Sequence, residues 1–169
     1  MKLNYRLRYE MRHAKHPFVL IGGIAFVVFS LISLWIGGNP KPVLLLLNKT
    51  SSALGQLLFF ILWLVSNLFS GFLFGALFLA DDRCTQLIST RSALLIIISQ
   101  LFSFLSYPLF FACNAWLLSF IALLLALCFC AASILASYRV TLIGTCILIV
   151  HFALLLWAVV RVATIIFMN

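Results

Sequence analysis

The chain has 169 residues, of which 66% are hydrophobic and only 8% are charged, and its mean hydropathy is +1.26. About a quarter of the residues of soluble domains are charged, and one core of this size could not hide so much apolar surface. The composition therefore excludes a soluble globular protein. The net charge is +8, and a group of basic residues lies before the first apolar run, at Lys2, Arg6, Arg8, Arg12 and Lys15. A basic segment beside an apolar one is typical of membrane topology rather than of nucleic-acid binding.

The first apolar run extends from Phe18 to Ile36 and ends at Gly37 and Gly38. It is long enough to cross a bilayer as a helix, which takes about 20 residues. No small-residue cleavage site follows it, so we expect a retained helix rather than a signal peptide.

Four further apolar runs follow, at about 54–79, 92–112, 115–136 and 140–167. Five such runs predict an all-α fold, an integral membrane bundle of five transmembrane helices. Most of the connections are short, which makes consecutive helices antiparallel neighbours. We divide the chain into a basic N-terminal segment, residues 1–17, and a transmembrane domain, residues 18–169.

The orientation follows from the distribution of lysine and arginine. Most of them lie in the N-terminal segment, in the 80–91 loop and at Arg139, which share one side of the membrane, whereas the first loop holds only Lys41 and Lys49. The positive-inside rule then places the N-terminus in the cytoplasm. We expect a multi-pass protein of a bacterial cell membrane.

Polar side chains within the spans indicate the functional face, because in lipid they turn toward the bundle interior. In the second helix, Phe59, Trp63, Asn67 and Ser70 form one stripe. This stripe fits either a pocket for a flat ligand or simple interhelical packing with one hydrogen bond.

Two other patterns also fit more than one interpretation. Ser99, Ser103 and Ser106 share a face of the third helix, with Gln100 beside them, which indicates packing or a dimer face. Gly71 and Gly75 form a small-xxx-small pair, which indicates a close helix contact within the chain or between subunits.

In the fifth helix, His151 lies near the middle of the membrane. It fits a heme ligand or proton relay, or a hydrogen-bonded interior residue, and no second ligand is evident. The spans hold no carboxylate, which argues against an ion-coupled transporter. No nucleophile–base set, phosphate-binding loop or metal-ligand spacing is present, so the sequence favours a protein that is not an enzyme and holds no metal.

Several residues together resemble the TspO family, also known as tryptophan-rich sensory or translocator proteins. Lys49, Phe59, Trp63 and Gly71 keep the spacing of that family's first loop and second helix. Residues 108–111, Pro-Leu-Phe-Phe, are similar to its third helix, and residues 157–169 are similar to its fifth. The resemblance covers almost the whole chain.

The resemblance implies a bundle that is often dimeric and has a pocket opening toward the first loop. In that family the pocket binds porphyrins, sterols or synthetic aromatic ligands. It therefore implies no required cofactor, but a porphyrin or heme-related ligand. Carried over by position, and with the candidates above, the ligand-binding residues are Phe59, Trp63, Asn67, Ser103, Ser106, His151, Leu154, Trp157 and Ala158.

The chain departs from the family at some of these positions. The family's third-helix asparagine and tryptophan appear as Ser103 and Ser106, and its fifth-helix tryptophan falls at Leu154. We therefore do not predict porphyrin degradation. We expect a TspO-like protein that binds a hydrophobic or tetrapyrrole ligand, with the bilayer and a second copy as partners. The alternative is a membrane subunit or scaffold whose polar stripes are packing or partner surfaces.

Overall fold

The computed structural model describes residues 16–38, 53–78 and 86–168, with side chains at 17–38, 60–78 and 87–167. Within them the chain forms five helices, α2 (His16–Gly37), α4 (Ala53–Phe78), α5 (Gln86–Phe111), α6 (Trp116–Ser137) and α7 (Leu142–Met168). Each contains a stretch long and apolar enough to cross a membrane, and no strand occurs in the described ranges. The predicted all-α bundle is confirmed, and the chain is an integral, multi-pass membrane protein.

The third predicted helix starts earlier than the expected residue 92. In the structure α5 begins at Gln86, because the polar residues of its first turns find partners inside the bundle. Ser89 donates a hydrogen bond to the Leu77 carbonyl of α4, and Ser92 pairs with Ser137 of α6. Their low hydropathy hid the helix, yet hydroxyls bonded between helices are common in membranes. The predictions for residues 1–15, 39–52 and 79–85, including Lys49, lie outside the described residues.

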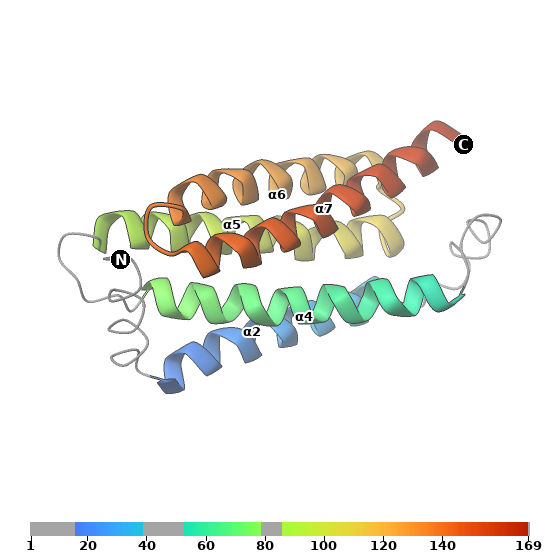
Figure 1. Cartoon of the computed structure of the whole chain (residues 1–169). Helices are drawn as coiled ribbons and strands as arrows, with labels where there is room; N and C mark the ends of the chain where they lie inside the picture. Colours follow the sequence, from blue (N-terminus) through green and yellow to red (C-terminus); the bar gives the residue numbers. More distant parts are fainter. Residues whose placement is uncertain (1–15, 39–52, 79–85, 169) are drawn as a thin grey trace.

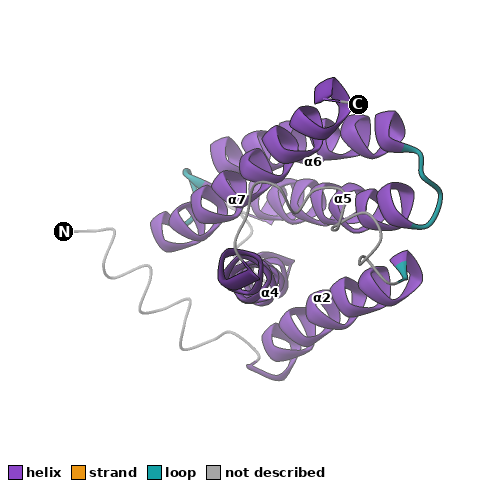
Figure 2. Ribbon diagram, turned by 90° about the vertical axis from the view of Figure 1, so that its right-hand side faces the viewer, coloured by secondary structure: helices purple, strands orange, loops and turns teal. Residues whose placement is uncertain are grey.

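The helices form two groups that pack along their length. Figure 1 shows α5, α6 and α7 together on one side and α2 with α4 on the other. Seen from the end in Figure 2, α4 lies between α2 and the other three helices, and it contacts α2, α5 and α7.

A tight turn joins α5 to α6. Asn114 adopts the left-handed conformation, with φ of 50°, and the Ala115 amide bonds the Leu109 carbonyl at 2.9 Å. This pattern is a common helix C-terminal cap, in which asparagine is tolerated after glycine. It makes α5 and α6 antiparallel neighbours.

The contact between α2 and α4 depends on glycine. A Cβ atom added to Gly22 would lie 2.6 Å from the Gly71 carbonyl oxygen, and one added to Gly75 would lie 2.9 Å from the Val19 Cα. Both approaches are closer than a side chain can tolerate. The Gly71–Gly75 pair therefore makes its close helix contact within the chain.

The α5 helix holds its neighbours through hydrogen bonds to backbone carbonyls. Ser99 of α5 donates to the Ala126 carbonyl of α6 at 2.8 Å. Ser33 of α2 donates to the Phe104 carbonyl of α5, which lacks its helical partner because Pro108 has no N–H. The serine stripe of α5 is buried inside the chain, where it packs against other helices.

Candidate ligand site

A buried histidine joins three helices at the middle of the bundle. The His151 side chain of α7 is 1% exposed, and its Nδ1 lies 2.7 Å from Ser66 Oγ of α4. Its Nε2 lies 3.0 Å from Gln100 Nε2 of α5. One turn away on either side, Leu148 and Leu155 belong to two separate apolar clusters. The polar contacts therefore form a layer between two apolar ones.

Both ring nitrogens of His151 are occupied within the chain. When the Gln100 amide donates to Nε2, the ring hydrogen lies on Nδ1 and is donated to Ser66 Oγ. A heme iron could take either nitrogen only by breaking one of these bonds. The described residues hold no group of three or more metal-ligating side chains. The interior, hydrogen-bonded interpretation of His151 fits this geometry.

Asn67 extends the network to a fourth helix. Its Nδ2 donates to Ser30 Oγ of α2 at 3.1 Å. One turn along α4, the Trp63 ring lies with its centroid 5.8 Å from that of His151, tilted by 38°. The structure thus brings together three predicted residues, Trp63, Asn67 and His151, and adds Ser66 and Ser30. We call these five and Gln100 the central polar network.

Several polar atoms in and beside the network have no hydrogen-bond partner among the described residues. They are Asn67 Oδ1, Gln100 Oε1, Ser70 Oγ and Ser103 Oγ, all on side chains that are at most 2% exposed. A buried polar atom without a partner costs about 1–3 kcal/mol. Such atoms are rare in native structures and mark places where water, an ion or a ligand completes the bonding.

The remaining predicted residues lie around this centre in different ways. Ser106 donates to the Ser103 carbonyl of its own helix at 2.7 Å. Ala158 packs against the apolar cluster between α6 and α7, as Trp63 does, while Leu154 is partly buried. The side chain of Phe59 lies outside the described residues.

Trp157 points away from the network. Its side chain is 42% exposed, and the Arg161 guanidinium carbon lies 4.9 Å from the centre of its ring. A cation above an indole ring is a favourable contact, and it lets Arg161 lie against the helix surface. The structure does not bring Trp157 together with Trp63 and His151.

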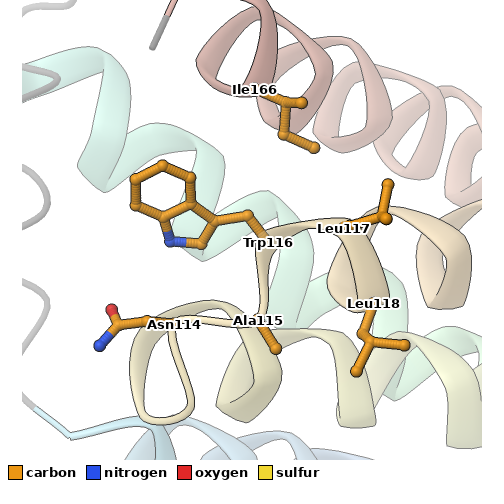
Figure 3. A pocket seen from close by; sticks show the side chains of 6 residues that line it. All are labelled: Asn114, Ala115, Trp116, Leu117, Leu118 and Ile166. Carbon is orange, nitrogen blue, oxygen red and sulfur yellow. The ribbon is translucent and has the colours of Figure 1, made fainter.

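A surface hollow of about 500 Å³ lies at the end of the bundle where α5 turns into α6. Figure 3 shows its lining, which consists of Asn114, Ala115, Trp116, Leu117, Leu118 and Ile166. The Trp116 ring stacks on Phe110, with the ring centroids 6.3 Å apart. None of the nine predicted ligand residues lines this hollow. A tryptophan at the start of an apolar run, directly after a tight turn, was the available signal for it.

Sequence reasoning also missed Ser66 and Ser30. The spacing from Trp63 to Asn67 was read as one stripe, and Ser66 lies beside that stripe rather than on it. A histidine within an apolar helix requires hydrogen-bond partners, so polar residues of the other spans were candidates for it.

No family model matches the chain, and no curated protein or solved structure is significantly similar to it. What is established is an integral membrane protein of five helices with a polar network buried at its centre.

Proposed function

We propose that this protein binds a largely apolar, flat small molecule of the tetrapyrrole type between α4, α5 and α7. The observation that carries the proposal is the set of unpaired polar atoms around His151, beside the Trp63 ring. Polar residues inside a membrane are expensive, and they commonly mark substrate or ligand sites. Unpaired atoms there are explained if a ligand completes their bonding.

The surroundings of the network suit such a ligand. Trp63 offers an aromatic face for stacking, and it borders the apolar cluster that includes Leu123, Leu155 and Val159. The resemblance to the TspO family supports the same location, since the pocket of that family lies between the corresponding second, third and fifth helices.

A second candidate function is a membrane subunit or scaffold without a small ligand. It is favoured by the hydroxyls of Ser33, Ser99 and Ser119, which all bond backbone carbonyls of neighbouring helices. In that case the central network only fixes how the helices pack.

Tryptophan fluorescence separates the two candidates. In one variant Trp35, Trp116 and Trp157 are replaced by phenylalanine, so that Trp63 is the only fluorophore. In a matched control only Trp157 remains, on a partly exposed face. Both proteins, in nanodiscs, are titrated with protoporphyrin IX.

The ligand proposal expects saturable quenching of Trp63 at concentrations at which Trp157 is quenched only in proportion to the porphyrin dissolved in the lipid. Equal, non-saturating quenching of the two reporters would reject it and favour the scaffold.

A further inference from the structure

We infer that the central site selects a ligand that donates hydrogen bonds, and that Asn67 and Gln100 determine this specificity. The inference rests on the proposed function and names the chemistry of its ligand: an apolar body that carries an O–H or N–H group.

The inference follows from counting donors and acceptors in the central polar network. The Asn67 amide nitrogen donates to Ser30, and the Gln100 amide nitrogen bonds His151. The other nitrogen of His151 bonds Ser66. Each of these nitrogen-bearing groups is thus engaged within the chain, whereas the two amide oxygens, Asn67 Oδ1 and Gln100 Oε1, have no donor among the described residues.

The two free oxygens lie around one histidine. Asn67 follows Ser66 directly along α4, Ser66 contacts one ring nitrogen of His151, and Gln100 of α5 contacts the other. The side chains of Asn67 and Gln100 are 0% and 1% exposed. Lipid and bulk water therefore do not reach these oxygens as they do exposed ones.

Two hydroxyl groups extend the same pattern along the helices. Ser70 lies three residues after Asn67, and Ser103 lies three residues after Gln100, so each shares a helix face with its amide. Both serine oxygens are also unpaired. A hydroxyl can donate or accept, so it adapts to a bound group, whereas an amide oxygen only accepts.

A ligand with acceptors alone cannot complete this site. An ether, ester or ketone would leave both amide oxygens unpaired, and it would lose the hydrogen bonds it made in water or at the lipid interface. Sites built to bond an O–H or N–H discriminate strongly against analogues that lack it, because the buried partner is left without a bond.

Two isomeric probes test the inference on the protein with Trp63 as its only fluorophore. They are 2-(9-anthryl)ethanol and 9-(methoxymethyl)anthracene, which have the same atoms and the same ring system. Only the alcohol has a hydrogen-bond donor. Anthracene absorbs where tryptophan emits, so binding quenches Trp63. Probe concentrations are expressed per lipid, which corrects for partitioning into the nanodisc.

We expect the alcohol to bind about ten-fold more tightly than the ether, as one buried hydrogen bond implies. Asn67→Leu combined with Gln100→Leu should reduce this ratio to about one. Ser99→Ala, a control on the opposite, α6-facing side of α5, should retain it. Folding of each variant is checked by gel filtration and by the midpoint of unfolding.

Equal binding of the two isomers by the unsubstituted network would overturn the inference, even if porphyrin binding at Trp63 is confirmed. A preference for the alcohol that persists in the double variant would overturn the assignment to Asn67 and Gln100. If neither probe nor protoporphyrin quenches Trp63 saturably, the proposed function itself fails.

Discussion

The Ser33 hydroxyl of α2 donates to the Phe104 carbonyl of α5, the backbone acceptor that Pro108 leaves without its helical N–H. Proline within a membrane helix is tolerated when a neighbouring group bonds the freed carbonyl. Here that group comes from a helix far away in the sequence, so the proline is paired with a specific residue of α2.

A double-mutant cycle tests this pairing. Ser33→Ala should reduce the free energy of unfolding by about 1 kcal/mol, the upper range for interhelical bonds in membranes. In a Pro108→Ala background the new N–H bonds the Phe104 carbonyl, so the same change should have little effect. Unfolding in mixed micelles by SDS measures both. The same loss in both backgrounds would show that Ser33 does not act through this carbonyl.

Replacement of His151 should loosen three helices at once. His151→Leu removes the bonds to Ser66 and Gln100, and we expect a loss of roughly 1–2 kcal/mol in the free energy of unfolding. Val150→Leu, on the exposed neighbouring face, is the control and should be nearly neutral. Because Ser66 bonds His151, Ser66→Ala should cost less in the His151→Leu protein than alone. Fully additive losses would contradict the shared network.

A larger side chain at Gly71 should separate α2 from α4. A Cβ atom there would clash with the Gly22 backbone, which cannot move as a flexible side chain can. Gly71→Leu should therefore destabilise the protein by about 1–3 kcal/mol or more. Ala76→Leu, on an exposed part of the same helix, should not. Thermal unfolding of the two purified proteins compares them, and equal midpoints would rule out the close contact.

The proposed orientation can be read from cysteine labelling in intact cells. Cys113 is exposed beside the α5–α6 turn, which the positive-inside rule places outside the cytoplasm. A membrane-impermeant maleimide should label it from outside, and Cys113→Ser should abolish that labelling. In the Cys113→Ser background, Arg139→Cys lies at the opposite end and should react only after permeabilisation. The reverse pattern would invert the topology.

The fold could be predicted from the sequence because each span is a long apolar run, and hydropathy detects such runs directly. The start of α5 was missed because Ser89 and Ser92 resemble loop residues until their partners on α4 and α6 are known. The central site was predicted in part. Trp63 and Asn67 follow from helical spacing, which depends on one helix alone.

The pairing of Ser66 with His151 could not be predicted in the same way. It joins residues 85 positions apart, and it depends on how α4 and α7 are rotated about their axes. Apolar residues surround both helices, so the sequence does not restrict that rotation. For the same reason Trp157 was expected at the site, although it lies on another face of α7 with Arg161.

The tight turn at Asn114 bears on how the protein is made. The α5 span is less apolar than α6, with mean hydropathies of 1.9 and 2.7. Its serines, such as Ser99, find their acceptors on α6. If the two helices leave the translocon together as a hairpin, those hydroxyls are already bonded when they reach lipid, and the more apolar partner carries the more polar one into the membrane.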